Sequence, residues 1–219
     1  WFYEQRMFPF NHLPEDAYVK AIEQRDQMRN SLGFAFDNAV TWSNIGPTSG
    51  FYFSYNNISG RVTTVKYDPI NPNVVYIGAA FGGVWKSTNG GNNFTPVTDN
   101  ENSMSSGSIA VDPVNNNIVY YGSGEATYSG ASYYGRGIFK STNGGSTWVN
   151  ITSGLPSLTY CSRIIIRPGF SNQLLAAMGT SGLYRSTDAG VTWSQLVSGR
   201  CDDVIFSPNG TNAYITGSG

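Results

Sequence analysis

Charge is the property that this 219-residue sequence has least of. Asp, Glu, Lys and Arg together make up 12% of the residues, and the formal net charge is −1. A balance so close to zero gives no electrostatic reason for binding nucleic acid or an anionic membrane. The sequence also has no apolar run near the roughly 18 residues that a membrane-spanning helix needs. We therefore expect neither nucleic-acid binding nor membrane insertion.

Histidine is nearly absent as well. His12, the single histidine, stands close to the N-terminus, so the rest of the chain holds neither a Ser-His-Asp triad nor a histidine-based metal site. Ca²⁺ takes about six to eight oxygen ligands, and the adjacent acids Asp202 and Asp203 supply only part of such a set. We expect no cofactor, with Ca²⁺ the one candidate.

The sequence is rich in glycine, asparagine, serine, threonine and tyrosine, with 26 Gly and 14 Tyr. Together with a hydrophobic content of 40%, this composition is typical of short strands that polar turns connect. Few charges and many Tyr, Asn and Ser also favour an extracellular or cell-surface location. The chain begins at Trp1 without a signal-like apolar segment, so we interpret it as a processed mature chain.

One eight-residue turn occurs three times, at 87–94, 141–148 and 186–193. Its serine and its Asn or Asp can hydrogen-bond the backbone of the turn, its glycine accepts a positive φ, and its closing aromatic ring can bury one face. The pattern therefore predicts three β-hairpins. The defining positions are Ser87, Asn89, Gly91, Phe94, Ser141, Asn143, Gly145, Trp148, Ser186, Asp188, Gly190 and Trp193.

A second repeated element is an apolar run that ends in a proline and is followed by another apolar run. The prolines are residues 69, 113, 168 and 208, so they recur after 44, 55 and 40 residues. Four short strands, A to D, in a period of this length indicate a β-propeller blade. We expect an all-β propeller of four-stranded antiparallel blades, namely blade 1 at 61–98, blade 2 at 107–152, blade 3 at 161–197 and a partial blade 4 at 201–219.

The region before the blades has a different pattern. Residues 1–39 are expected to form an N-terminal extension with one helix, because the proline and two acids at 14–16 suit a helix start and Gly33 suits its end. Two alternatives remain open for this helix. It can pack on the propeller portion, 40–219, or it can dock on a partner protein.

One strand of the propeller portion stands alone. Residues 40–46 match the strand that follows a repeat turn, but no such turn precedes them. We predict that this segment closes the last blade of the ring and so removes an open sheet edge. The remaining blades, or further domains, are expected C-terminal to residue 219.

The repeat turn resembles the Asp-box, Ser-x-Asp-x-Gly-x-Thr-Trp, of the bacterial neuraminidase (BNR) repeat. The third copy has the Asp, as Asp188, and the other two have Asn. With Gly-Gly-Val-Trp-Lys-Ser at 82–87 and the Asp-Pro pairs, residues 40–219 are similar to sortilin-like and xyloglucanase-like propellers of secreted bacterial proteins. The resemblance implies about half of a larger propeller and a cargo of type IX secretion. It does not select a function, because such propellers include sialidases, glucanases, sorting receptors and assembly factors.

Alternating strand directions put the repeat turns and the A–B turns on one face, and the B–C loops and D–A connections on the other. From the proline to the basic residue before the repeat turn there are 17 residues in blade 1 (69 to 86) and in blade 3 (168 to 185), but 27 in blade 2 (113 to 140). A lengthened loop on a rigid scaffold is a common place for function. The candidate binding residues on this face are Glu125, Tyr128, Tyr133, Tyr134, Arg136, Asp99, Glu101, Arg200 and Asp202.

These residue types suit a secreted, non-catalytic module that binds glycan, peptide or a partner protein, because flat rings stack and charges orient a ligand. The alternative interpretation is structural. In that case Tyr133 and Tyr134 cover blade edges, and Glu125 caps a turn or pairs with Arg136. A third interpretation is a subunit of an extracellular assembly that the N-terminal helix docks onto a neighbour.

A glycoside hydrolase is the enzymatic alternative, because Glu125 and Asp99 could supply the two carboxylates that this reaction needs. The resemblance to xyloglucanase-like enzymes implies a catalytic Asp two residues before the Gly-Gly of blade 1, where this sequence has Ala80. The resemblance implies that the second catalytic Asp lies outside this chain. We therefore favour a non-catalytic role.

Cys161 and Cys201 each precede the proline of their blade by seven residues, so they occupy the same position in blades 3 and 4. Two outcomes remain open. A disulfide between the blades would suit an oxidising compartment and needs Cα atoms within about 6.8 Å. Two buried thiols are the alternative.

Overall fold

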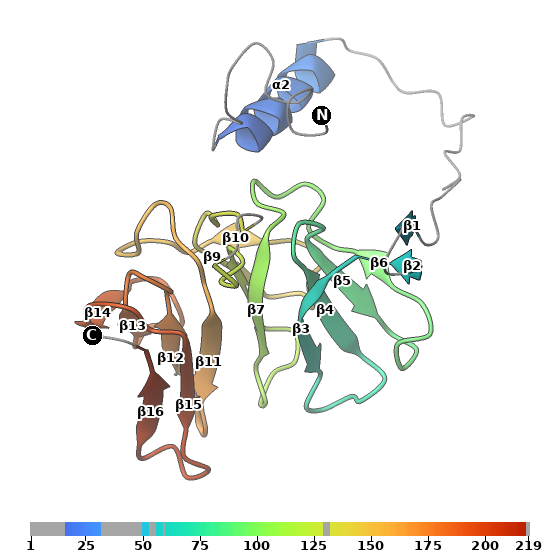
Figure 1. Cartoon of the computed structure of the whole chain (residues 1–219). Coiled ribbons are helices and arrows are strands. Elements are labelled where there is room, and N and C mark those ends of the chain that lie inside the picture. Colours follow the sequence, from blue (N-terminus) through green and yellow to red (C-terminus); the bar gives the residue numbers. More distant parts are fainter. Residues whose placement is uncertain (1–15, 32–49, 53–55, 59, 129–131, 218–219) are drawn as a thin grey trace. The chain divides into compact units, whose positions relative to one another are not determined.

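The computed structural model describes residues 16–31, 50–52, 56–58, 60–128 and 132–217. The chain divides into two compact units, Trp1–Gly60 and Arg61–Gly219 (Figure 1). This boundary lies C-terminal to the one expected after residue 39. The segment 40–46, predicted to close the last blade, lies outside the described residues.

The N-terminal unit contains a helix, α2 (Ala17–Ser31), and a hairpin of β1 (Gly50–Tyr52) and β2 (Asn56–Ile58). The helix lies where the sequence predicts it. Asp16 stands just before the first residue of the helix. The carbonyl of Asp16 accepts the N–H of Lys20, and the carboxylate of Asp16 pairs with the ammonium of Lys20 at 2.8 Å. Among the described residues no helix is long and apolar enough to cross a bilayer.

The second unit is built from antiparallel sheets whose strands follow one another in sequence order. Three sheets have four strands each and are blades 1 to 3, and a two-stranded sheet begins blade 4. Blade 1 consists of β3 (Val62–Tyr67), β4 (Val75–Ala79), β5 (Val84–Ser87) and β6 (Thr95–Pro96). Blade 2 consists of β7 (Ser106–Val111), β8 (Val119–Ser123), β9 (Ile138–Ser141) and β10 (Val149–Asn150). Blade 3 consists of β11 (Arg163–Arg167), β12 (Phe170–Ala177), β13 (Leu183–Ser186) and β14 (Ser194–Val197), and blade 4 of β15 (Asp203–Phe206) and β16 (Ala213–Thr216).

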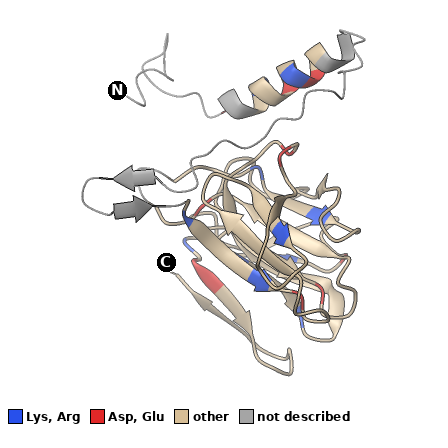
Figure 2. Ribbon diagram, turned by 90° about the vertical axis from the view of Figure 1, so that its right-hand side faces the viewer, with Lys and Arg blue, Asp and Glu red and all other residues tan. Residues whose placement is uncertain are grey.

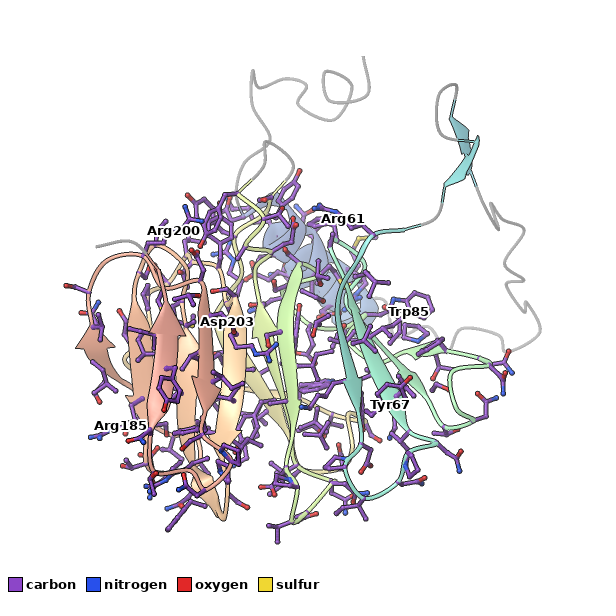
Figure 3. The ribbon with its side chains drawn as sticks, turned by 60° about the horizontal axis from the view of Figure 1, so that its bottom comes forward. Arg61, Tyr67, Trp85, Arg185, Arg200 and Asp203 are labelled. Carbon is purple, nitrogen blue, oxygen red and sulfur yellow. The ribbon has the colours of Figure 1, made fainter. Side chains whose placement is uncertain are left out.

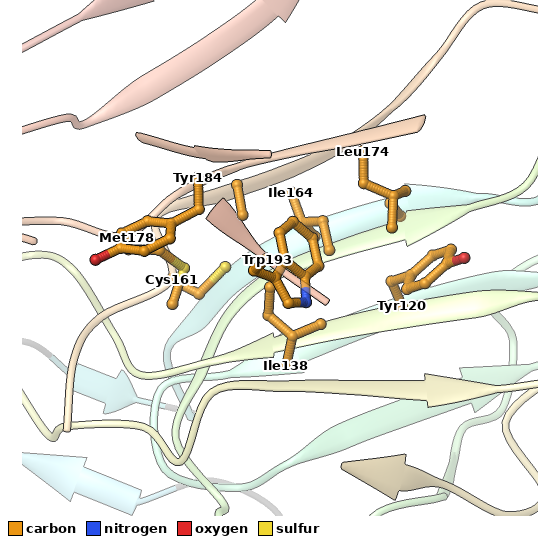
Figure 4. Close-up of a cluster of buried hydrophobic side chains, with 10 residues drawn as sticks. Tyr120, Ile138, Cys161, Ile164, Leu174, Met178, Tyr184 and Trp193 are labelled. Carbon is orange, nitrogen blue, oxygen red and sulfur yellow. The ribbon is translucent and has the colours of Figure 1, made fainter. Parts of the chain in front are cut away.

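The hydrophobic core lies between successive blades. The cluster in Figure 4 joins blade 2, through Tyr120 and Ile138, to blade 3, through Ile164 and Leu174, and Trp193 of the third repeat turn packs into it. A second cluster joins blades 1 and 2 in the same way, and a third joins blades 3 and 4. Sheets stacked face to face around such cores are the architecture of a β-propeller. The predicted fold class is confirmed.

The two faces of the propeller unit differ in what they carry. The first two repeat turns each donate a backbone N–H to the A–B turn of their own blade, as Gly90 does to Asn73 at 2.8 Å, and the third donates to Asn172 near the start of β12. At the opposite face the B–C loops bond the D–A connections, as Gly83 N does to Met104 O at 2.8 Å. We call these faces the turn end and the loop end. In Figure 3, Arg185 lies at the turn end, and Arg61 and Arg200 lie at the loop end.

Charged positions are scattered singly over the ribbon of the propeller unit, as Figure 2 shows. The formal net charge of the chain is −1. A basic stripe would attract a polyanion over a long range, and this distribution of charges gives no support for such an attraction.

Candidate binding site at the loop end

The repeat turns, which lie at the turn end, have a structural role, and their hydrogen bonds show why. In the first turn, Ser87 Oγ accepts the N–H of Gly91 at 2.9 Å and donates to Asn89 Oδ1 at 2.9 Å. Asn89 Oδ1 also accepts the N–H of Asn93 at 3.0 Å. The same bonds recur in the other two copies, and the glycine at the Gly91 position has a φ of +90°, +89° and +89° in turn. Only glycine adopts this conformation without strain.

The second repeat turn binds blade 1. Its Gly144 carbonyl accepts the hydroxyl of Tyr76 at 3.1 Å and the ammonium of Lys86 at 2.7 Å. Its Trp148 indole N–H donates to the carbonyl of Val97 at 2.9 Å. We call Tyr76, Lys86 and Val97 the turn-binding surface of blade 1. All three bonds join neighbouring blades.

The third repeat turn binds blade 2 with the same chemistry. Its Ala189 carbonyl accepts the hydroxyl of Tyr120 at 3.3 Å and the ammonium of Lys140 at 3.1 Å. Its Trp193 indole N–H donates to the carbonyl of Ile151 at 2.9 Å. Tyr120, Lys140 and Ile151 are thus the turn-binding surface of blade 2. The turn end is used for packing blades together.

The Asp-Pro turns add a further contact between blades, and here two neighbouring pairs of blades differ. Asp68 Oδ2 in blade 1 accepts the side-chain N–H of Asn116 in blade 2 at 2.8 Å. Asp112 Oδ1 in blade 2 accepts the hydroxyl of Ser171 in blade 3 at 3.0 Å. Because the Ser171 hydroxyl bonds Oδ1, the oxygen that already accepts two backbone N–H groups, Asp112 Oδ2 is left buried without a hydrogen-bond partner.

The long B–C loop of blade 2 begins at the loop end with Glu125, whose side chain is 1% exposed. Its carboxylate forms an ion pair with Arg61, with distances of 2.5 and 3.0 Å to the two guanidinium nitrogens. It also accepts the hydroxyl of Thr127. Glu125 therefore pairs with the start of blade 1, and the proposed pairing with Arg136 is wrong.

Two consecutive tyrosines of this loop reach in different directions. Tyr133 lies against Phe81 of the blade 1 B–C loop, with ring centroids 4.6 Å apart. Tyr134 stacks on Tyr160 of the connection to blade 3, with centroids 4.6 Å apart and an angle of 23° between the planes. Phe81 and Tyr134 are still 52% and 45% exposed. The loop end thus presents two fixed but accessible aromatic rings.

Tyr128 joins this loop to the start of blade 4. Its hydroxyl donates to Asp202 Oδ1 at 3.0 Å, and the Arg200 guanidinium lies over its ring at 4.2 Å. Arg200 Nε in turn bonds both oxygens of Asp202, at 2.8 and 2.9 Å. Tyr128 also meets Tyr160 edge-on, with centroids 5.6 Å apart. Its φ of +52° is a conformation that a residue with a Cβ seldom adopts.

The surroundings of Tyr128 and Asp202 shift the pKa values of both side chains. Burial and then the hydrogen bond to Asp202 raise the pKa of Tyr128 to about 12. The hydrogen bond from Arg200 is the main cause that lowers the pKa of Asp202 below its usual value. At neutral pH the group is therefore a neutral phenol beside a fixed arginine–carboxylate pair.

The remaining predicted residues are Asp99, Glu101 and Arg136. Asp99 is exposed in the connection between blades 1 and 2, and burial raises the pKa of the neighbouring Glu101. Among the described residues, no hydrogen bond, ion pair or ring contact joins either acid to Tyr128 or Tyr134. Arg136 donates its backbone N–H to Ser123 Oγ at 2.8 Å.

The structure also adds residues that the sequence patterns did not single out at the loop end. These are Arg61, Phe81 and Tyr160, each of which lies in a loop or at the start of a strand, outside the repeated elements. In the sequence these three residues share one property: each is aromatic or basic and lies in or next to a predicted B–C loop or D–A connection. That signal is shared by many other residues of this tyrosine-rich chain.

The cysteines take the second of the two predicted outcomes. Cys161 and Cys201 are free and buried, so no disulfide joins blades 3 and 4. Cys161 belongs to the core cluster between blades 2 and 3, whereas Cys201 belongs to the cluster between blades 3 and 4. Because the two thiols face different cores, each fills space beside its own neighbouring blade. Burial raises the pKa of Cys161 to about 12.

Within the described part of the chain, no group of three or more His, Cys, Asp or Glu side chains gathers where it could hold a metal ion. The two acids considered for Ca²⁺ have arginine partners. Asp202 pairs with Arg200 at 2.8 Å, and Asp203 pairs with Arg163 at 3.4 Å.

Solved structures resemble this chain, whereas no protein-family model and no curated protein matches it. An ancestral GH74 enzyme is 28% identical over 71% of this chain and 22% of its own length, with a TM-score of 0.60. The GH74 xyloglucanase from Xanthomonas campestris is 22% identical over 72% and 28%, with a TM-score of 0.57. An auxiliary nutrient binding protein from Bacteroides thetaiotaomicron is 13% identical over 72% and 36%, with a TM-score of 0.53.

These likenesses agree with the fold built from the strands, a partial β-propeller. The chain spans about a quarter of the length of the GH74 enzymes that it matches. The likeness therefore covers only a part of such an enzyme, and the function of this chain has to be argued from its own residues.

Proposed function

We propose that this chain is a non-catalytic binding module that acts outside the cell or at its surface and binds carbohydrate at the loop end. The observation that carries the proposal is the ring of Tyr134, which is 45% exposed and held in place by stacking on Tyr160. A ring fixed in this way can bind a flat ligand without first losing rotamer freedom.

Carbohydrate suits the chemistry around this ring. A sugar has flat C–H faces that stack on tyrosine and hydroxyl groups that bond charged side chains. Tyr160 contacts Tyr128, which connects the stacked pair to the Arg200–Asp202 ion pair. The likeness to a GH74 enzyme at 28% identity supports carbohydrate over peptide as the ligand.

A glycoside hydrolase is the rival, because the same likeness favours it. Hydrolysis needs two available carboxylates. The carboxylate of Glu125 is buried and is occupied by Arg61 and Thr127, so it is poorly placed to reach a glycosidic oxygen. Ala80, in the position where the resemblance implies a catalytic Asp, has no group that can exchange a proton. These observations favour binding without cleavage.

The test measures binding of the whole chain to soluble xyloglucan and to other plant and bacterial polysaccharides by isothermal titration calorimetry. Replacing Tyr134 by Ala should weaken binding about tenfold, since it removes the exposed stacking ring. Phe170→Ala is the matched control, because Phe170 is similarly exposed, at 46%, but is the first residue of β12, next to the A–B turn at the turn end. Equal losses in both variants would contradict the proposed site.

The rival is tested on the same samples by assaying new reducing ends. Release of reducing sugar that Glu125→Gln abolishes would establish hydrolysis and reject the non-catalytic proposal. Binding without release, in the unchanged chain and in Glu125→Gln alike, is the expected result.

Secretion, and type IX secretion in particular, belongs to this proposal and is supported by the composition and by the resemblance of the repeat turns. Fractionation of the native cells tests it, with the protein expected in the medium or on the surface.

Assembly through the N-terminal helix is the remaining candidate function. Deleting residues 1–39 should leave polysaccharide binding unchanged, whereas loss of a native complex would favour assembly.

A further inference from the structure

Three equivalent positions of the D–A connections contact the long B–C loop of blade 2. Ser105, Tyr160 and Arg200 each stand eight residues before the proline of their blade (105 to 113, 160 to 168 and 200 to 208). Ser105 Oγ donates to a backbone carbonyl of this loop at 3.1 Å. Tyr160 and Arg200 lie against the ring of Tyr128, at 5.6 and 4.2 Å. The position recurs from blade to blade, whereas the side chain at it does not.

Arg200 is fixed at one side of its guanidinium. Its Nε donates to both carboxylate oxygens of Asp202, at 2.8 and 2.9 Å, and the planar group lies over the Tyr128 ring. Apart from this contact with Tyr128, its two terminal nitrogens have no hydrogen-bond partner among the described residues, and the side chain is 44% exposed. These nitrogens hold the remaining guanidinium donors in one plane, an arrangement that can bond a carboxylate through both of its oxygens.

A second arginine of the loop end is bonded in the reverse way. Arg61 donates from both terminal nitrogens to the two carboxylate oxygens of Glu125. Its side chain is 47% exposed, close to the value for Arg200, but the edge that could bond a ligand carboxylate is occupied. Exposure therefore does not distinguish these two arginines. What distinguishes Arg200 is the unoccupied distal edge of a guanidinium that is already held in position.

The negative charge of Asp202 does not cancel the attraction of this edge for an anion. Asp202 bonds Nε, so an anion at the terminal nitrogens would lie on the opposite side of the guanidinium, roughly twice as far from Asp202 as from Arg200. Because Coulomb energy falls with distance, roughly half of the attraction remains. A neutral hydroxyl gains no such energy, and hydrogen bonds between two charged groups are the stronger kind.

The exposed ring of Tyr134 lies near this edge. Centroid distances of 4.6 Å to Tyr160 and 5.6 Å from Tyr160 to Tyr128 connect it with the guanidinium that covers Tyr128. Figure 3 shows Arg200 at the loop end. One short oligosaccharide can therefore stack a sugar ring on Tyr134 and bring a charged group to Arg200.

We propose that Arg200 selects an acidic sugar, a uronic acid whose carboxylate bonds the distal edge of the guanidinium while a ring of the same oligosaccharide stacks on Tyr134. The selection rests on the proposed function, since it requires that the loop end binds carbohydrate. Charged positions are scattered singly over the propeller unit, so the acid is recognised by a short-range contact. Because Arg200 is partly exposed, added salt should weaken the selection.

The experiment gives the whole chain two forms of one ligand, oligogalacturonate and its methyl ester. The two have the same rings and the same length, but the ester lacks the negative charge. Isothermal titration calorimetry should find the acid bound at least about tenfold more tightly than the ester. Equal affinities, or binding of neutral xyloglucan without binding of the acid, would overturn the selection and leave the proposed function intact. Failure of every polysaccharide to bind would reject the proposed function, and the selection with it.

Three variants assign the preference to its residue. Arg200→Ala should bind the acid no more tightly than the ester, and the ester within about twofold of its affinity for the unchanged chain. Arg200→Lys keeps the charge without the planar donors and should retain part of the preference. Arg185→Ala, which removes an exposed arginine at the turn end, is the matched control and should retain all of it. A misfolded variant would lose the ester as well. A full preference for the acid in Arg200→Ala would reject Arg200 as its cause.

An acidic peptide is the rival source of the carboxylate. Oligoglutamate has the charge of oligogalacturonate but no flat C–H face that could stack on Tyr134. It should bind at least about tenfold more weakly than oligogalacturonate, and Tyr134→Ala should reduce this difference. Equal binding of the two probes would assign Arg200 to acidic peptides and overturn its selection of a sugar.

Discussion

The turn end and the loop end of the same blades are held together by different kinds of contact. At the turn end one set of bonds appears twice, with Tyr76 and Lys86 of blade 1 replaced by Tyr120 and Lys140 of blade 2. At the loop end the side-chain contacts of the long blade 2 loop each appear once, as that of Glu125 with Arg61 does. Repetition marks the contacts that any blade needs for packing. The contacts that do not repeat mark the end where this chain differs from its own repeat pattern, and this is the end at which we propose that it binds its ligand.

The largest effect should come from a repeated aromatic. Trp148 is 9% exposed, packs in the cluster between blades 1 and 2, and donates to Val97. Trp148→Ala should therefore lower the free energy of unfolding of the propeller unit by about 3–5 kcal/mol. Tyr134→Ala at the loop end should cost less than about 1 kcal/mol, since its ring is 45% exposed. Urea unfolding followed by tryptophan fluorescence and circular dichroism measures both, and equal costs would break the distinction between the two ends.

The second largest effect on stability should come from the loop end, at the ion pair of Arg61 with Glu125. Arg61→Ala leaves the carboxylate of Glu125 buried with Thr127 as its remaining side-chain partner. A cost of about 2 kcal/mol is expected, below the range for a fully buried pair because the Arg61 side chain is 47% exposed. Arg61→Lys should recover only part of this, since lysine cannot bond both carboxylate oxygens in the same way. Chemical unfolding of the three proteins gives the answer, and an unchanged midpoint in Arg61→Ala would show the pair to be dispensable.

A third prediction compares the two contacts of the Asp-Pro turns and has the opposite sign. Ser171→Asn should supply Asp112 Oδ2 with the donor that Asn116 supplies to Asp68. Stability should rise by about 1 kcal/mol, because a buried unpaired acceptor gains a hydrogen bond. Ser171→Ala is the control and should lower stability by a similar amount. Thermal unfolding measures the order, and Ser171→Asn melting below the unchanged chain would contradict the explanation of the unpaired oxygen.

The smallest effect is a pH dependence of stability that distinguishes the third repeat turn, which has Asp188, from the first two, which have Asn. Hydrogen bonds from the side chain and the backbone of Thr192, and from Ser186, lower the pKa of Asp188 from 3.8 to about 2. A lowered folded-state pKa means that the contribution is present above about pH 4 and is lost as the pH falls towards 2. Asp188→Asn, which copies the first two turns, should lack this dependence. Unfolding midpoints of both proteins at pH 5 and pH 2.5 should therefore differ less at the lower pH, and a constant difference would argue against the shift.

The repeated contacts were the part of the fold that the sequence could predict. Prolines, apolar runs and repeat turns recur, and a residue that recurs at one position in each blade must do the same task in each. The partners across blades were also present in the pattern, since Tyr76 and Tyr120 recur, as do Lys86 and Lys140. Their contacts were not predicted, because the acceptors lie 68 and 69 residues from the tyrosines and 58 and 49 residues from the lysines, and only the stacking of blades brings them together.

The loop end was predictable as a place but not as a set of contacts. The extra length of the blade 2 loop identified it. The partner of Glu125 is 64 residues away, just before the first strand of blade 1, and within the described part of the chain this contact has no counterpart from which it could be inferred. For the same reason Tyr160 was not predicted as the ring on which Tyr134 stacks.

The bonds from each repeat turn to the preceding blade also have a consequence for the order of folding. During synthesis, the turn-binding surface of blade 1 stays uncovered until Gly144 has emerged, 68 residues after Tyr76. At ordinary rates of translation this delay is on the order of ten seconds. Each blade then offers a finished surface on which its successor can fold, as in other repeat proteins. We therefore expect the order of the blades in the sequence to be also their order of assembly, because blade 1 is fully synthesised before blade 3 has left the ribosome.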